Sequence, residues 1–171
     1  MSQDITKYSL NGDEMGVLNP DAKILKYTQL DDYNNIEEIF SDCNKVIILY
    51  LLQSDWQGHW VCLFKNIRGI HFFDSYGHPY DYEIERLTPE KRKQLDEEKS
   101  QLKILLKDKN VDYSFVKYQD NDTNTCGCFV SHRLNNYKID NRDYLNLFLK
   151  NDVSNPDLFV AKYCFNKLKY L

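Results

Sequence analysis

Residues 46–74, VIILYLLQSDWQGHWVCLFKNIRGIHFFD, decide the fold that the sequence predicts. They contain three short apolar runs, Val46–Leu52, Trp60–Lys65 and Ile70–Phe73. The runs are too short for buried helices and the first is rich in β-branched residues, so each predicts a strand buried on both faces. The four residues Asn66–Gly69 have the length and the glycine of a hairpin loop. This stretch therefore predicts three adjacent antiparallel strands at the centre of the protein.

Downstream of these strands, the sequence predicts helices and one more strand. Pro89–Lys109 is charged and helix-forming, with a thin apolar stripe of leucines. Tyr113–Tyr118 alternates between polar and apolar side chains, which indicates a strand. Cys126–Tyr137 has apolar residues at helical spacing, and Asn124 or Thr125 can cap its first turn.

Two more helices are predicted near the end of the chain, the first capped by Asn141 and the second opened by Asn155-Pro156-Asp157. Before the sheet, residues 1–30 show only turn signals, and residues 31–40 predict a short helix. A central, mainly antiparallel sheet with helices packed outside it is an α+β fold. The length of 171 residues fits one domain, which we expect to span residues 1–171.

The composition is ordinary for a globular protein and shows no strongly basic surface. The net charge is −4 and the pI is near 5.6, whereas a nucleic-acid binder usually presents a basic face. The basic cluster Lys91-Arg92-Lys93 is followed by Asp96-Glu97-Glu98, which indicates one solvated helix face.

No apolar segment is long enough to span a bilayer, and Met1-Ser2-Gln3-Asp4 lacks the basic-then-apolar order of a signal peptide. We therefore expect a protein that neither crosses a membrane nor is secreted.

Five cysteines without an export signal predict free thiols in a reducing compartment. Cys62 lies in an apolar strand and Cys164 in an apolar helix, so both are expected in the core, and Cys43 is expected to be free as well. Cys126 differs, because a helix predicted to begin there would place its thiol at the positive end of the helix dipole, which favours the thiolate. Cys126 is therefore a candidate nucleophile, although an isolated Cys-Gly pair also occurs at half-buried structural sites.

Cys126, Cys128 and His132 allow a second interpretation, as metal ligands. Residues two apart on a helix face different ways and no fourth ligand lies near in the sequence, so we expect no metal site. The same geometry argues against Cys128 as the nucleophile, since its thiol would point away from the side that Cys126 presents.

His59 is the candidate general base, because it opens a predicted strand where its ring would stand at a sheet edge facing a cleft. The other three histidines lie within a strand, in a turn and on the helix behind the candidate nucleophile. Asp74 ends the next strand and by itself could be a turn former. If the two strands pair through the short hairpin, His59 and Asp74 become neighbours across the ladder. The carboxylate would then hold the imidazole ring and stabilise its charged form.

Gln119 ends the strand after the charged helix, seven residues before Cys126. A side-chain amide at that place could donate a hydrogen bond to a developing oxyanion, beside the backbone N–H of Cys126. Taken alone, Gln119 is only a polar residue that leaves a strand. An imidazole, a carboxylate, an amide and a thiol together are what a cysteine acyl-transfer enzyme needs.

The local sequence around these residues resembles a known family. Four elements occur in the order of the adenovirus-type (adenain-like) maturation proteases and, more distantly, of the proteases of SUMO and other ubiquitin-like proteins: Gly58-His59-Trp60-Val61-Cys62-Leu63-Phe64, Phe73-Asp74-Ser75-Tyr76-Gly77-His78, Gln119 and Cys126-Gly127. The first two are most similar to proteases of virophages and Polinton-like viruses. The resemblance covers about residues 46–134. It implies a fold of the papain-like clan with the nucleophile at a helix N-terminus.

The resemblance implies a nucleophile, a base, an orienting acid and an oxyanion donor, which are Cys126, His59, Asp74 and Gln119. It also implies that Trp60, Gly58 and Gly127 line the substrate groove. Adenovirus enzymes carry Glu where this chain has Asp74, so the acid does not separate the viral branch of the family from the branch that acts on ubiquitin-like proteins.

The resemblance further implies cleavage of capsid precursor proteins, beside small residues such as glycine, during virion maturation. Such an enzyme would act in the virion and in the cytoplasmic virus factory of the host cell, without a cofactor. The sequence leaves open whether a peptide activates it. Adenovirus enzymes use DNA as an activator, but the lack of a strongly basic cluster predicts no strong activation by DNA here.

Three other functions fit the same residues. A deconjugating protease for ubiquitin-like proteins shares the triad, and acetyltransferase effectors use it to pass an acyl group to Ser, Thr or Lys instead of water. A degenerate protease fold could also serve as a capsid-associated binding module. The intact set of four residues argues against this non-enzyme alternative.

Overall fold

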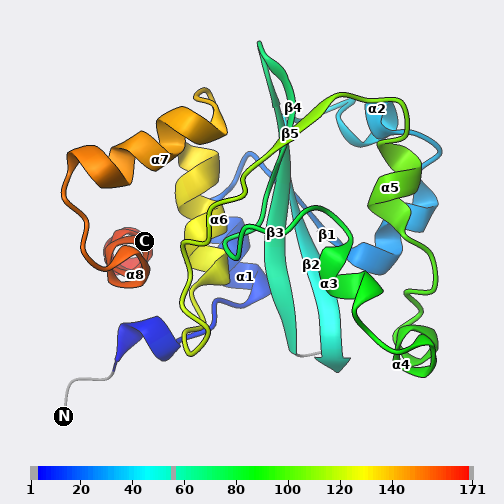
Figure 1. The fold of residues 1–171 in the computed structure, drawn as a ribbon, viewed down its shortest axis with the longest axis horizontal. Helices are drawn as coiled ribbons and strands as arrows, with labels where there is room; N and C mark the ends of the chain where they lie inside the picture. Colours follow the sequence, from blue (N-terminus) through cyan, green and yellow to red (C-terminus); the bar gives the residue numbers. More distant parts are fainter. Residues whose placement is uncertain (1–3, 55–56, 170–171) are drawn as a thin grey trace.

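The computed structural model describes residues 4–54 and 57–169, and a five-stranded sheet forms its centre (Figure 1). The strands lie in chain order and comprise β1 Lys23–Lys26, β2 Lys45–Ser54, β3 Gln57–Asn66, β4 Gly69–Phe73 and β5 Val111–Tyr113. β2, β3 and β4 pair antiparallel, which confirms the three central strands predicted from residues 46–74. The outer pairs β1–β2 and β4–β5 are parallel, so the sheet is mixed rather than mainly antiparallel. Long connections that contain helices precede β2 and β5, and such crossovers allow parallel pairing.

The hairpin between β3 and β4 has the predicted tight loop. Asn66 pairs with Gly69, so only Ile67 and Arg68 lie between the two strands. Gly69 has φ of 119°, a conformation that residues with a side chain rarely adopt, which explains the glycine at this turn.

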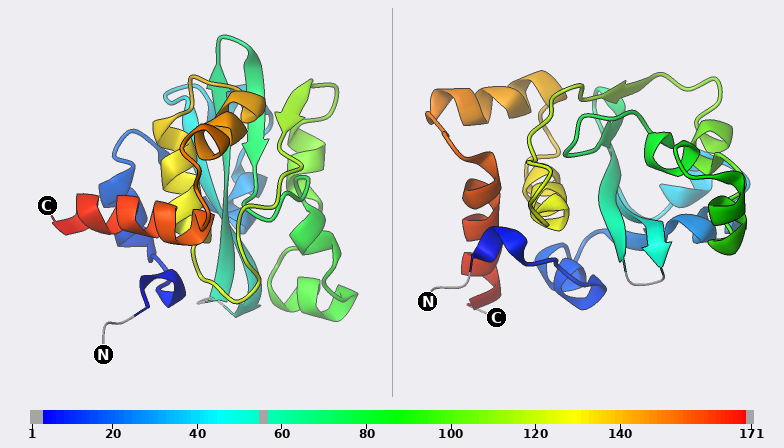
Figure 2. Two further views of the ribbon diagram at one scale, coloured as in Figure 1. Left: turned by 60° about the vertical axis from the view of Figure 1, so that its left-hand side comes forward. Right: turned by 60° about the horizontal axis from the view of Figure 1, so that its bottom comes forward.

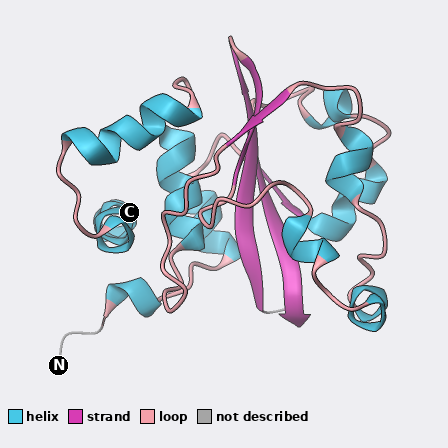
Figure 3. Ribbon diagram, viewed as in Figure 1, coloured by secondary structure: helices cyan, strands magenta, loops and turns pink. Residues whose placement is uncertain are grey.

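Helices cover both faces of the sheet, as Figures 1 and 3 show. One face carries α1 Gly12–Leu18, α6 Cys126–Asn135, α7 Asn141–Lys150 and α8 Pro156–Lys169. The other carries η2 Tyr27–Asp32, α2 Ile36–Ile39, α3 Tyr82–Glu85, α4 Pro89–Gln94 and α5 Gln101–Leu105. The short helix η1 Ile5–Lys7 lies beside α8 (Figure 2). Tyr8, which follows η1, packs edge-on against Phe165 of α8 with ring centroids 5.4 Å apart. The α+β class is thereby confirmed.

The core is divided by the sheet into two halves, and β3 contributes to both. Trp60, Cys62 and Phe64 belong to the half that contains α6, whereas Val61 and Leu63 belong to the other half. Side chains of a strand alternate between its faces, so a strand covered on both sides must be apolar at every position. This burial explains the continuous apolar run that predicted the strand.

Two predicted elements are shorter than expected. The helix predicted for Pro89–Lys109 is broken between α4 and α5, where Asp96 has φ of 56° and interrupts the helical backbone. Its leucines are still buried: Leu102, Leu105 and Leu106 belong to one half of the core, and Leu95 directly follows α4. The strand predicted for Tyr113–Tyr118 ends at Tyr113, and the segment beyond it is irregular.

The N-terminal region is more regular than the sequence suggests. Asn11 does not form a turn with Gly12 but caps α1, in a capping box with Glu14. β1 is a further element that the sequence did not predict, since its four residues are too few to show a period. Within the described residues, α7 is capped by Asp140 rather than by Asn141, which is its first helical residue.

Candidate active site

His59 on β3 and Asp74 just after β4 lie in contact. Nε2 of His59 is 2.8 Å from Oδ1 of Asp74, and both side chains are buried. The ladder pairs Cys62 with Phe73, so Asp74 does not lie directly opposite His59 and the contact is diagonal. Oδ1 of Asp74 also accepts a hydrogen bond from the backbone N–H of Tyr76 at 2.8 Å, which fixes the carboxylate in its turn.

The surroundings of His59 favour its charged form. Burial disfavours the imidazolium, but the carboxylate of Asp74 and the thiol of Cys126 outweigh burial and hold the pKa of His59 well above its usual value. The ring of Tyr76 stacks on the imidazole, with centroids 4.9 Å apart and planes 21° apart. Burial, followed by the nearby Cys126 and Asp74, raises the pKa of Tyr76 to about 12. Tyr76 therefore stays neutral beside the imidazolium.

Cys126 is the first residue of α6, and only 6% of its surface is exposed. Its thiol interacts with the imidazole of His59. Because Nε2 of that ring faces Asp74, Nδ1 is the nitrogen left for the sulfur. The first backbone N–H groups of a helix have no intrahelical partner, and their dipole favours an anion at this place. The structure thus brings a thiol, an imidazole and a carboxylate close together, and their catalytic roles stay a prediction.

Gln119 is buried at the start of the segment that leads to Cys126, and its amide is held at both atoms. Its Nε2 donates to the backbone carbonyl of Thr123 at 3.1 Å, and its Oε1 accepts from the hydroxyl of Ser75 at 2.7 Å. A carbonyl can only accept, so this contact fixes which end of the amide is nitrogen. Nε2 carries two hydrogens, and one remains for a ligand.

The residues with a predicted substrate contact mainly serve packing. The indole of Trp60 is 6% exposed and donates to the carbonyl of Leu10 at 3.0 Å. A Cβ at Gly127 would lie 3.0 Å from the sulfur of Met15 and 3.2 Å from both Leu10 and Trp60. Gly58 is exposed, and a Cβ there would lie 2.2 Å from the carbonyl oxygen of Tyr50. These glycines allow close packing, and their contact with a substrate stays a prediction.

Cys128 and His132, two of the three residues considered as metal ligands, have other partners in the structure. Cys128 interacts with Cys164, and this contact, followed by burial, raises the pKa of its thiol. Nδ1 of His132 lies 2.8 Å from the hydroxyl of Tyr144. Burial, ahead of the nearby Arg133, lowers the pKa of His132 to about 4, so its ring is neutral.

A different set, Asp74, His78 and Glu83, places potential metal-ligating atoms within 4.8 Å of one another. Nδ1 of His78 already contacts Oε1 of Glu83 at 2.6 Å, and Asp74 is held by His59. Among the described residues, Oδ2 of Asp74 has no hydrogen-bond partner although it is buried. His78 and Glu83 are therefore polar neighbours of the Asp74 carboxylate.

Comparisons with known proteins give one informative relative. The chain is 30% identical to the uncharacterized protein V9 of Sputnik virophage in an alignment of 129 residues, which covers 72% of this chain and 73% of V9. The chain belongs to the family of virophage protein V9. No model of an established protein family matches it. Among solved structures, ChlaDub1 from Chlamydia trachomatis superposes with a TM-score of 0.42 and 13% identity, covering 100% of this chain and 96% of that one. This score is too low to assign a shared fold.

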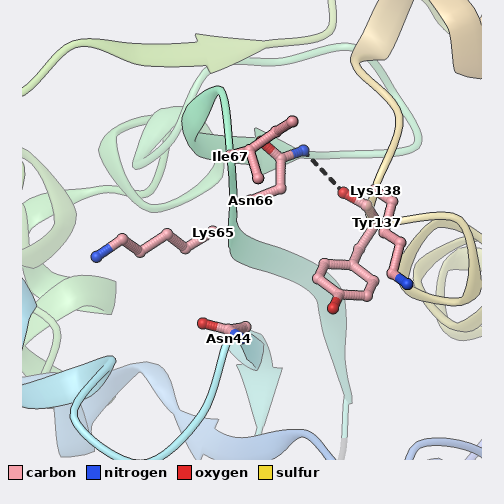
Figure 4. A pocket seen from close by; sticks show the side chains of 6 residues that line it. All are labelled: Asn44, Lys65, Asn66, Ile67, Tyr137 and Lys138. Atoms are coloured by element: carbon pink, nitrogen blue, oxygen red, sulfur yellow. Dashed lines mark hydrogen bonds between the residues drawn. The ribbon is translucent and has the colours of Figure 1, made fainter.

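Two hollows lie at different distances from the candidate site of this V9-family protein. One of about 490 Å³ is lined by Tyr76, whose ring stacks on His59, together with Glu83 and Lys117. Another of about 530 Å³ lies at the hairpin end of β3 (Figure 4), where Asn66 donates to the carbonyl of Tyr137. Of these two hollows, only the first adjoins the candidate site.

Sequence reasoning missed the residues that support the candidate site. Ser75 holds Gln119, Tyr76 covers His59, and Asp157 accepts hydrogen bonds from the loop before Cys126. Ser75 and Tyr76 follow Asp74 directly in the sequence, so their position next to a candidate site residue could have predicted their supporting role. Asp157 lies 31 residues after Cys126, since 157 − 126 = 31, and no local pattern links the two.

Proposed function

We propose that this V9-family protein is a cysteine endopeptidase that cleaves capsid precursor proteins during virion maturation. The observation that carries the proposal is the buried His59–Asp74 contact of 2.8 Å, with the thiol of Cys126 near enough, at the start of a ten-residue helix, to raise the pKa of His59. Separate strands and a helix converge here on three groups that together activate a nucleophile.

Acylation would begin from a thiolate–imidazolium pair of Cys126 and His59. The thiolate attacks the carbonyl carbon of the scissile bond, and the negative charge moves to the carbonyl oxygen. The free N–H of Gln119 and the backbone N–H of Cys126 would stabilise that oxyanion. The imidazolium then gives its proton to the departing amine, the C–N bond breaks, and a thioester remains on Cys126.

Deacylation would reuse the same groups. His59, now neutral, removes a proton from a water molecule as that water attacks the thioester carbon. The C–S bond breaks, the acid product leaves, and the thiolate–imidazolium pair is restored. Asp74 stays charged throughout and orients the ring.

Two observations support the proposed substrate class. The family relationship to a virophage protein supports a viral setting, and the resemblance in residues 46–134 supports capsid precursors as substrates. No helix in the described part of the chain is long and apolar enough to cross a membrane.

A mass-spectrometric assay tests the proposal against its alternatives. The protein is incubated in parallel with a capsid precursor, with a ubiquitin-like fusion and with acetyl-CoA plus an acceptor peptide. We expect cleavage of the precursor by the wild type and by Cys128→Ala, and none by Cys126→Ala or His59→Ala. Cleavage by Cys126→Ala, or acetyl transfer without hydrolysis, would contradict the proposal.

A further inference from the structure

The loop of residues 120–125 connects the proposed oxyanion donor Gln119 to the nucleophile Cys126. It contains no regular secondary structure, yet its position decides where both groups stand. A displacement of about 1 Å at an active site can lower turnover roughly 10²-fold. Some other part of the protein must therefore hold this loop in place.

The carboxylate of Asp157 holds the loop from α8. Oδ2 accepts from the backbone N–H of Asp120 at 3.1 Å, and Oδ1 accepts from the hydroxyl of Thr123 at 2.7 Å and from that of Thr125. Asp157 is 2% exposed and Thr125 is fully buried. One buried carboxylate thus binds the beginning, the middle and the end of the loop.

We propose that Asp157 is a positioning residue for the oxyanion donor, a role that rests on the proposed peptidase function. The chain of contacts is short. Asp157 binds Thr123 through its side chain, and the carbonyl of Thr123 accepts from Nε2 of Gln119. Asp157 also binds Thr125, the N-cap residue of α6 that directly precedes Cys126.

A carboxylate in the first turn of a helix also stabilises that helix through the dipole. The role of Asp157 goes beyond this effect on α8, because its carboxylate turns away from solvent and towards the loop of residues 120–125. Asp143 in the first turn of α7 is an acid in the same kind of position but is exposed. Asp143→Asn is therefore the matched control, which removes a first-turn charge without touching the loop.

The first test measures hydrogen–deuterium exchange and needs no substrate. Asp157→Asn keeps the size of the side chain but replaces one acceptor oxygen with a donor. We expect exchange in residues 120–125 to be at least about 10-fold faster than in the wild type, with α8 still protected. Asp143→Asn should leave the loop unchanged. Unchanged exchange of the loop in Asp157→Asn would overturn the proposal.

The second test is a double-mutant cycle with Gln119→Ala, measured by turnover of one peptide and normalised to titrated active sites. Asp157→Asn should lower kcat about 10–10²-fold with little change in KM, and less than about 3-fold further in the Gln119→Ala background. Equal losses in both backgrounds would mean that Asp157 does not act through Gln119, which would overturn its positioning role.

The two tests separate this proposal from the function on which it rests. A wild-type protein that hydrolyses no peptide would refute the peptidase function. The exchange experiment would in that case still decide whether Asp157 holds the loop, because it reads the loop itself.

Discussion

At the residue scale, the candidate site depends on side chains whose hydrogen bonds leave no choice of orientation. The amide of Gln119 is fixed because Thr123 offers only an acceptor, and Ser75 must therefore donate. Such double restraint preorganises a donor at no cost during the reaction.

Ser75→Ala should weaken the oxyanion donor without weakening substrate binding. The substitution leaves Oε1 of Gln119 buried without its donor, which costs about 1–3 kcal/mol of stability and frees the amide to rotate. We expect kcat to fall roughly 10-fold at constant KM. Ser114→Ala is the control, since it removes another buried hydroxyl that contacts Val116 instead. A rise in KM at constant kcat would assign Ser75 to substrate binding.

Asp74→Asn should shift the pH dependence of activity. Asp74 raises the pKa of His59 against the effect of burial, so its loss lowers that pKa. The imidazolium needed to protonate the leaving amine is then lost at lower pH, and the alkaline limb of kcat/KM should move down. Turnover at the optimum should fall about 10²–10⁴-fold. An unmoved alkaline limb would contradict the assignment.

The stability of the fold should depend on pH through the same pair, His59 and Asp74. A raised folded pKa means that the contribution of the His59–Asp74 pair is fully present below the unfolded pKa of about 6.5. It is lost as the pH rises through the higher folded pKa. Urea unfolding of the wild type should show this loss, and Asp74→Asn should not.

At the element scale, the sequence predicts best where burial on both faces makes a short segment apolar throughout. The buried residues of β2, β3 and β4 are covered on both faces, and their apolar runs together with the hairpin glycine indicated the three central strands. The break at Asp96 was not predictable, because the surrounding charged residues are good helix formers and the left-handed residue that ends α4 is an aspartate and not the usual glycine. β1 and the role of Asp157 depend on pairing and contacts between distant segments, which no local pattern encodes.

Gly127→Ala tests whether packing or substrate room explains the glycine after Cys126. The added methyl would lie 3.2 Å from Leu10 and Trp60, and only the flexible Met15 can yield easily. We expect a loss of about 1–3 kcal/mol of stability in urea unfolding. Unchanged stability with a raised KM would instead support a substrate-contact role.

At the scale of the whole molecule, the charges are distributed in pairs. Lys7, Lys23, Lys45, Lys99, Lys103 and Lys109 each form an ion pair with an acidic side chain. Arg133 is fully buried between the rings of Phe64 and Tyr144. These cations are therefore already engaged within the protein, which carries a net charge of −4.

DNA should accordingly stimulate peptide cleavage less than about 2-fold, since non-specific affinity requires several cations free to neutralise phosphates. The measurement compares initial rates at low salt with and without duplex DNA. Poly-aspartate serves as a control for an unspecific polyanion effect. A large stimulation that disappears with added salt would show that a basic surface does form.

The central claim is that Cys126 is a nucleophile activated by His59, and competitive alkylation of the native protein tests it most directly. Limiting iodoacetamide at neutral pH, followed by peptide mass mapping, compares all five cysteines in one molecule. Cys43 is the internal reference, since it is partly exposed and burial raises the pKa of its thiol. We expect Cys126 to react at least about 10-fold faster than Cys43 in the wild type, despite its burial, and to lose this advantage in His59→Ala. Preferred labelling of Cys128, or equal labelling of Cys126 with and without His59, would contradict the account.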